Sequence, residues 1–161
     1  MAARKVTFDQ FRKLVGAELG VSDWIAVDQT VIDQFADSTR DHQWIHVDVE
    51  RATRESPFGA PIAHGFLTLS LISGFSYEIG PEPEGLEVTI NYGLDKVRFL
   101  APVRAGDRLR LRKSLLSLEE KDPGRWLMKS KCVMEIEGQE KPALIAETLT
   151  LFVTESATAD A

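Results

Sequence analysis

A long segment without charged side chains is the feature that most constrains how this chain folds. Between Glu55 and Glu78 the sequence has 22 residues with no Asp, Glu, Lys or Arg. Its second half, residues 64–77, has no proline and no run of β-branched residues, which favours a helix. The run is interrupted by hydroxyl side chains and is shorter than the roughly 20 apolar residues that a membrane span needs. A helix that is apolar on nearly every side has to be buried, so we expect a central helix over residues 65–79.

Three stretches downstream have the two-residue apolar period of half-buried strands, and a fourth is a β-prone run. Turn signals such as Pro123-Gly124 separate them. The expected strands lie at residues 86–94, around 108–112, at 126–136 and at 143–153. Short connections between consecutive strands predict an antiparallel sheet. We therefore expect an α+β hotdog fold, in which a curved antiparallel sheet wraps around the long central helix. A homodimer would bury the surface that such a single layer leaves open.

Shorter elements are expected upstream of the central helix. Asp28 is placed to cap one amphipathic helix, and another has Val15 among its inward residues. The expected elements are a helix over residues 7–18, a strand over 24–27, a helix over 29–38, and a short helix capped by Asp48 that ends near Glu55.

The composition indicates one ordinary globular domain. A chain of 161 residues can bury a core without disulfide or metal staples, and we expect one domain over residues 1–154 with a flexible tail over 155–161. The net charge of −6 is evenly spread, so we expect no nucleic-acid partner. Cys132 is the single cysteine, which excludes an intrachain disulfide, and no signal peptide is recognisable. We expect a cytoplasmic protein without a membrane partner.

The three histidines flank the start of the uncharged segment, at His42, His46 and His64. Asp41 lies five residues before His46, so the two would be about 140° apart on a helix and would face opposite sides of a strand. They converge only if the chain turns between them, and we expect a loop here. A convergent carboxylate and imidazole suit the activation of water at neutral pH. Spacing alone favours a plainer interpretation, in which Asp41 is a turn residue and His46 a satisfied loop histidine.

His64 and Gly65 open the predicted central helix. The first turn of a helix carries unpaired N–H groups and the positive end of the helix dipole. In a dry site such donors can stabilise a developing oxyanion. Equally, Gly65 can serve packing alone, with His64 as a polar cap.

A metal site is a further interpretation of the histidines. His42 and His46 have the i,i+4 spacing of two ligands on a helix face, with His64 or Asp48 as a third. The loop expected here and the absence of the Glu of an H-E-x-x-H pattern argue against it. We expect no metal.

Basic residues are concentrated between Lys96 and Lys113, where seven of them accompany one acid, Asp107. They indicate either a site for a phosphate-bearing ligand tail or the solvated face of a strand, and the second is the better default. The sequence has neither a P-loop nor a G-x-G-x-x-G motif, so nucleotide hydrolysis and dinucleotide redox chemistry have no support.

Three spaced motifs together resemble the MaoC-like dehydratases, which include the (R)-specific enoyl-CoA hydratases. They are Asp41-x-x-x-x-His46, Pro61-Ile62-Ala63-His64-Gly65 and Val97-Arg98-Phe99-x-x-Pro102-Val103-x-x-Gly106-Asp107. The resemblance covers about residues 20–153. It is closest to the branch named for nodulation protein N and the related mycobacterial 3-hydroxyacyl-thioester dehydratases. Gln43-Trp44 stand where the usual motif has Asn-Pro, which bears on substrate shape more than on chemistry.

The resemblance implies reversible hydration of trans-2-enoyl thioesters of CoA or a carrier protein, giving (R)-3-hydroxyacyl thioesters without a cofactor. Asp41 and His46 would hold the reacting water, and the Gly65 amide would bind the thioester oxygen. The basic stretch becomes a candidate for the CoA phosphates and the uncharged helix for an acyl tunnel. Alternatives are a non-catalytic hotdog acyl-binding subunit and a hotdog thioesterase. The expected substrate-binding residues are His64, Trp44, Asn91 and Arg98.

Overall fold

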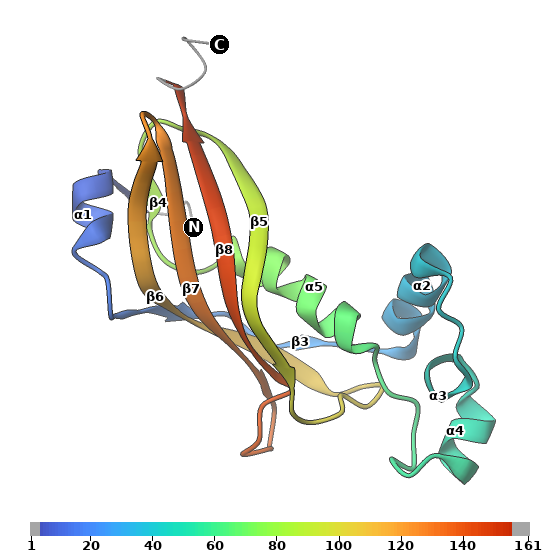
Figure 1. The fold of residues 1–161 in the computed structure, drawn as a ribbon. Coiled ribbons are helices and arrows are strands. Elements are labelled where there is room, and N and C mark those ends of the chain that lie inside the picture. Colours follow the sequence, from blue (N-terminus) through green and yellow to red (C-terminus); the bar gives the residue numbers. More distant parts are fainter. Residues whose placement is uncertain (1–3, 156–161) are drawn as a thin grey trace.

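One antiparallel sheet forms the framework of the chain, of which the computed structural model describes residues 4–155 (Figure 1). Its six strands follow the order β2-β6-β7-β8-β5, with β3 also pairing with β6. The sheet thus confirms the predicted hotdog architecture, and β5 lies at one edge. The strands are β2 (Glu18–Val21), β3 (Ile25–Ala26), β5 (Leu86–Phe99), β6 (Arg108–Asp122), β7 (Arg125–Ile136) and β8 (Leu144–Thr154). A small parallel pair joins β1 (Lys5–Val6) to β4 (Glu82–Pro83).

The central helix is α5 (Gly65–Ser76), which confirms the predicted helix but ends three residues earlier. The chain turns after Tyr77 and passes through Gly80, whose φ of 81° belongs to a turn rather than a helix. Leu67, Ile72 and Phe75 pack against the sheet in the main core cluster. Burial is one-sided, however: Phe66 is 70% exposed and Tyr77 83%. The expectation of a helix buried on every side is therefore wrong for a single copy.

Strand β5 differs from the half-buried strand that its sequence predicts. Its apolar residues Val88 and Ile90 are 46% and 42% exposed, whereas Thr89 and Asn91 line an internal cavity. Because successive side chains alternate between the faces of a strand, Thr89 and Asn91 face α5 whereas Val88 and Ile90 face away. Leu86 and Leu94 line the cavity as well, because irregularities in the pairing with β8 interrupt the alternation. Strand β5 can carry polar side chains toward α5 and apolar ones toward solvent because it is an edge strand whose inner face is only partly covered.

The N-terminal helix is shorter than expected. Helix α1 (Phe8–Arg12) begins at a capping box formed by Thr7 and Gln10, and turns replace the rest of the predicted helix. Gly16, with φ 88°, donates its N–H to Leu115 of β6, so the chain leaves the helix to pair with the sheet. Val15 is consequently 45% exposed instead of inward.

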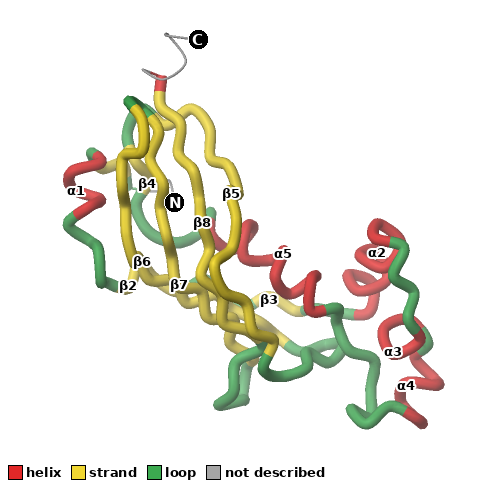
Figure 2. Tube along the Cα trace, viewed as in Figure 1, coloured by secondary structure: helices red, strands yellow, loops and turns green. Residues whose placement is uncertain are grey.

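Three helices lie together beyond the N-terminal end of α5 (Figures 1 and 2). Asp28 and Asp48 cap two of them, through bonds from the Val31 and Arg51 amides, as predicted. The helices are α2 (Gln29–Thr39), α3 (Trp44–Val47) and α4 (Val49–Glu55). Within residues 4–155, no helix combines the length and apolar character that crossing a bilayer requires. The expected tail, beyond its first residue, lies outside the described residues.

Candidate active site

A turn between α2 and α3 brings Asp41 and His46 together. Helix α2 ends at Thr39, and Arg40 adopts the left-handed conformation with φ 63°, which reverses the chain. His46 then sits on α3, a single helical turn where the sequence predicted a loop. One carboxylate oxygen of Asp41 and one ring nitrogen each of His46 and His64 all lie within 4.8 Å of one another. The convergence that the spacing required is therefore present.

His46 is held as a neutral base. Its ring is 7% exposed, and its Nδ1 lies 2.6 Å from the carbonyl oxygen of Ile62. Because a carbonyl only accepts, Nδ1 carries the hydrogen and donates it, which leaves the Nε2 lone pair available. Burial lowers the pKa of His46 below its usual value of 6.5, opposed in part by the bond to Ile62. The ring is thus suited to accept a proton at neutral pH.

His64 supports both partners. Its ring is 3% exposed and stacks on that of His46, with 3.8 Å between centroids. Its Nε2 lies 2.9 Å from the backbone carbonyl of Asp41 and must donate to it, which fixes the loop that carries the carboxylate. The other ring nitrogen, Nδ1, is buried and has no protein partner among the described residues. Asp41 itself is open, with 55% of its side chain exposed.

The N-terminus of α5 adjoins this pair, since His64 is its N-cap residue. No side chain caps the helix, so the first-turn N–H groups, including that of Gly65, lie outside the helix's own hydrogen bonds. A Cβ at Gly65 would lie 3.1 Å from the ring of Phe99, which is tighter than ordinary packing. Both explanations of Gly65 therefore stand: close packing against Phe99, and an amide left available to a ligand.

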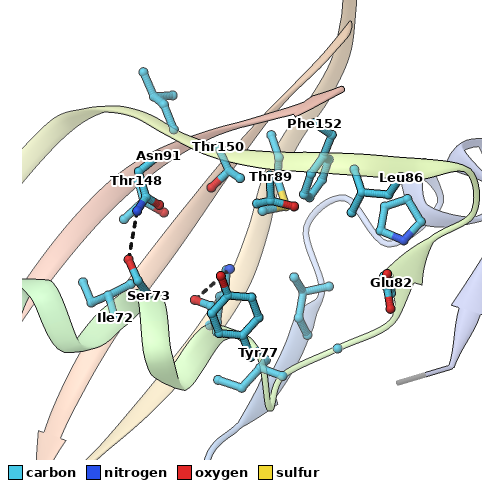
Figure 3. Close-up of a pocket in the computed structure, with 18 of the residues that line it drawn as sticks. Ile72, Ser73, Tyr77, Glu82, Leu86, Thr89, Asn91, Thr148, Thr150 and Phe152 are labelled. Carbon is cyan, nitrogen blue, oxygen red and sulfur yellow. Dashed lines mark hydrogen bonds between the residues drawn. The ribbon is translucent and has the colours of Figure 1, made fainter. Parts of the chain in front are cut away.

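A cavity of ≈ 550 Å³ lies between the C-terminal half of α5 and the sheet (Figure 3). Asn91, an expected substrate-binding residue, lines it and donates to Ser73 Oγ at 3.0 Å. Neither Asp41 nor His46 lines the cavity. Helix α5 and strand β5 nevertheless connect the two places, because Gly65 contacts Phe99 at one end and Ser73 contacts Asn91 farther along.

Two other residues singled out in the sequence face away from the pair. The Trp44 ring is half-buried and stacks under the Arg51 guanidinium, 4.2 Å from the ring centroid. His42 is paired with Asp37 at 2.8 Å. The sequence-based metal pair of His42 and His46 is therefore not assembled.

The cluster of Asp41, His46 and His64 has residue types that bind metals, but its hydrogen bonds do not suit one. The nitrogen of His64 near the Asp41 carboxylate, at 4.0 Å, is Nε2, and this atom carries the proton donated to the Asp41 carbonyl. A ligating nitrogen must be unprotonated. A metal bound through this nitrogen would thus break the bond that positions the loop.

Most of the basic stretch is committed to partners within the protein. Lys96, Arg108, Arg110 and Arg112 form ion pairs with glutamates. This outcome matches the strand-face interpretation for these residues. Lys113 instead points inward: it is 6% exposed and lines the cavity.

Two arginines of the stretch have no carboxylate partner within the described part of the chain. The exposed Arg98 donates to the Val97 carbonyl, next to Phe99, which covers Gly65. Arg104 is also exposed, and its backbone pairs with Ile62, the residue that binds His46. The backbone of both arginines therefore adjoins residues that contact the candidate site.

Ile62 and Phe99 stand in the quoted motifs, but their contacts with His46 and Gly65 could not be predicted, because a backbone acceptor and a ring contact depend on the fold. Lys113 did carry a signal. It lies in phase with Leu109, Leu111 and Leu115, the buried row of β6, so a lysine on an apolar parity marked an unusual position.

The chain resembles known proteins in both sequence and structure. Residues 10–131 match the family described as MaoC like domain. The chain is 48% identical over 138 residues to nodulation protein N of Rhizobium leguminosarum bv. viciae, which covers 86% of each chain. It is 44% identical over 138 residues to 3-hydroxyacyl-thioester dehydratase Z of Mycobacterium tuberculosis, covering 86% of this chain and 90% of that one. Among solved structures it resembles the R-hydratase PhaJ1 of Pseudomonas aeruginosa, with a TM-score of 0.65, 26% identity and coverage of 88% and 83%.

Proposed function

We propose, because the chain belongs to the MaoC-like domain family, that it catalyses the reversible hydration of trans-2-enoyl thioesters to (R)-3-hydroxyacyl thioesters. The relatives named as a 3-hydroxyacyl-thioester dehydratase and an R-hydratase support this class of reaction. The observation that carries the proposal is the convergence of the Asp41 carboxylate and the His46 ring within 4.8 Å, beside the uncapped start of α5.

The Asp41–His46 pair would activate the water. A separation of up to 4.8 Å lets one water oxygen lie about 2.8 Å from each group. The neutral His46 ring takes a proton from this water as its oxygen bonds to Cβ of the enoyl chain. The electron pair of the double bond moves toward the carbonyl, and the Asp41–His46 pair returns the proton taken from the water to Cα. The sum is the addition of one water molecule, and dehydration is the same path reversed.

The first turn of α5 would stabilise the enolate-like oxygen. Charge develops on the thioester oxygen as water adds to Cβ, and backbone N–H groups at a helix N-terminus are preorganised donors for it. The N–H of Gly65 is the first one of α5, because Gly65 directly follows the N-cap residue His64. Its lack of a side chain allows a ligand atom to approach the backbone.

The rest of the thioester would extend in two directions. The cavity beside α5 is suited to the acyl chain, with Asn91 on its wall. Arg98 and Arg104 lack carboxylate partners in the described chain and lie beside the residues that build the site, so they are candidates for the phosphates of CoA or of a carrier-protein pantetheine. Trp44 packs on Arg51 and would shape the outer edge of the site.

A homodimer would complete the fold. The uncovered side of α5, including Phe66 and Tyr77, adjoins the uncovered edge strand β5. A second copy related by two-fold symmetry offers the same surfaces in return. It would also cover the open side chain of Asp41 and exclude water from the site. We place this enzyme in the cytoplasm, in keeping with its single, buried Cys132.

An assay with crotonyl-CoA tests the proposal. Hydration removes the conjugated enoyl-thioester absorbance, so native protein should cause its decay. Asp41→Asn and His46→Ala should each slow the decay by about 10²-fold or more, the scale of a positioned acid or base, with little loss of thermal stability. His42→Gln is the matched control, because His42 is exposed and paired with Asp37. No decay with native protein, or equal decay with Asp41→Asn, would defeat the proposal.

The same assay separates the alternatives. A hotdog thioesterase would release free thiol, which a thiol reagent detects, whereas hydration releases none. A non-catalytic acyl-binding subunit would bind the thioester and produce neither signal. The buried, tautomer-fixed His46 beside a carboxylate favours the enzyme, because a binding module has no need of a base.

A further inference from the structure

Lys113 is a buried lysine with no acidic partner among residues 4–155. It occupies the inward row of β6, with Leu111 and Leu115 on either side, both of them 0% exposed. Its Nζ donates to Ser76 Oγ at 3.1 Å, and no carboxylate of residues 4–155 lies within ion-pair distance of it. A protonated lysine has three donors and Ser76 occupies one of them, so a bound anion would find unused donors here and would itself stabilise the charged form of Lys113.

The lining of the cavity is mostly apolar, but it also includes several hydroxyl and amide side chains besides Lys113. Figure 3 shows hydroxyl and amide side chains projecting from β5 and β8 toward α5. Four of these side chains line the cavity together with Ser73 of α5. They are Thr89, Asn91, Thr148 and Thr150.

Such a wall discriminates against a plain hydrocarbon. An alkyl chain entering the cavity would displace water from Lys113 and the hydroxyl groups without replacing its hydrogen bonds. A buried polar group left unpaired costs about 1–3 kcal/mol, and a charged group costs more. A site built around polar groups rejects a ligand that lacks the matching group far more strongly than an apolar pocket does. The occupant should therefore carry an anionic acceptor.

We infer that this cavity receives the far end of an acyl chain bearing a carboxylate, and that Lys113 binds this carboxylate. The inference rests on the proposed function, because the thioester end of the same substrate would lie at Asp41 and His46. It names the substrate class as mono-thioesters of dicarboxylic acids. Lys113 is then a specificity-determining residue and takes no part in the chemical step.

The geometry sets the length of the chain. Ser76, the partner of Lys113, is eleven residues after Gly65, which places it about 16 Å farther along α5. A chain that follows the helix from the Gly65 amide to Lys113 needs about a dozen carbons. The cavity lining begins on α5 at Leu69, about one helical turn beyond Gly65, so a short crotonyl chain would end before Lys113.

Two arrangements within the protein would account for Lys113 without a ligand. Glu82 also lines the cavity, but no ion pair joins it to Lys113 among the pairs within 4.0 Å in the described chain. Lys113 could instead serve only to stabilise the C-terminal end of α5, where a cation is favourable. That role predicts a loss of stability on mutation with no change in ligand preference.

Binding of saturated CoA thioesters tests the inference without turnover. The probes are the mono-CoA thioester of dodecanedioic acid and dodecanoyl-CoA, which has the same number of carbons and no carboxylate. Titration calorimetry should give a dissociation constant at least about tenfold lower for the dicarboxylic thioester. Lys113→Met should abolish this preference. Lys131→Met, a change of an exposed lysine on the neighbouring strand β7, should retain it.

Each failure has its own signature. Absence of the preference in the native protein overturns the inference, whether or not the variant folds. A preference that survives in Lys113→Met also overturns the inference, even if that variant melts at a lower temperature than the native protein. Failure of crotonyl-CoA hydration, by contrast, defeats the proposed function, because that chain is too short to reach Lys113.

Discussion

Replacing His64 by Phe separates the positioning of the site from its chemistry. In the native protein the His64 and His46 rings stack with 3.8 Å between their centroids. Phe keeps a flat ring against His46 and fills nearly the same buried space. It removes the N–H that donates to the Asp41 carbonyl at 2.9 Å. A hydrogen bond contributes about 1 kcal/mol to stability, so the melting temperature should fall by about 2–4 °C for a domain of this size.

The effect on catalysis should be much larger than the effect on stability. Without the bond, the loop that carries Asp41 can shift relative to His46, and a misplacement of about 1 Å costs about 10²-fold in rate. We expect kcat for crotonyl-CoA to fall by about that factor while KM changes little, because the substrate contacts remain.

His64→Gln is the conservative comparison, because its amide N–H can reach the Asp41 carbonyl and should recover part of kcat. Steady-state kinetics and thermal melts on the three proteins provide the measurement. The reasoning is refuted if His64→Phe keeps kcat within about threefold of native. It is equally refuted if kcat falls only in proportion to unfolded protein.

Three further outcomes follow from the site and the cavity. The acid limb of the pH profile of kcat/KM should lie below pH 6.5, because burial lowers the pKa of His46. His42→Gln should not move this limb, and a limb at or above pH 6.5 contradicts the assignment of His46 as a buried base. Gly65→Ala should reduce kcat/KM by about tenfold or more, and adding Phe99→Ala should restore thermal stability but not activity; full recovery of activity would mean that Gly65 serves packing alone. Burial lowers the pKa of Lys113 from 10.5, so between the lowered pKa and 10.5 the unfolded chain binds more protons than the folded one. The free energy of unfolding of the native protein should therefore rise with pH in this range. Urea titrations between about pH 8 and 10 should show a shallower rise in Lys113→Met, and equal slopes would refute this account.

Sequence periodicity predicted the buried strands well and the edge strand poorly. The alternation at residues 126–136 identifies the inward row of β7, where Trp126, Met134 and Ile136 are all buried. The same pattern in β5 places Val88 and Ile90 on the exposed face. Alternation distinguishes the two faces of a strand, but which face is covered depends on its neighbours and on its place in the sheet.

The candidate site was predictable in its residues and not in its hydrogen bonds. Asp41 and His46 could be singled out because their convergence demands a turn, and the expected end of the preceding helix and the Asp48 cap of the next one predicted a loop there. The tautomers of His46 and His64 depend on two backbone carbonyls, those of Ile62 and Asp41. These acceptors come from loops 16 and 23 residues away in sequence, and no side-chain pattern marks them.

The uncharged segment has two surfaces, and burial in one chain explains only one of them. Leu67, Ile72 and Phe75 face the sheet, where an unpaired charge would cost several kcal/mol. The opposite side of α5, with Ser70 and Gly74, is exposed in a single copy, and a charge there would cost almost nothing.

Contact with a second copy through α5, as in the proposed homodimer, would explain why this exposed side also lacks charge. Ser70→Arg should then convert a dimer to a monomer, measured by light scattering after size exclusion, and should lower the melting temperature. Ser38→Arg, at an exposed position of α2, should leave both unchanged. If the native protein is a monomer, or if Ser70→Arg stays dimeric with native stability, the uncovered side of α5 is not the dimer interface and the explanation fails.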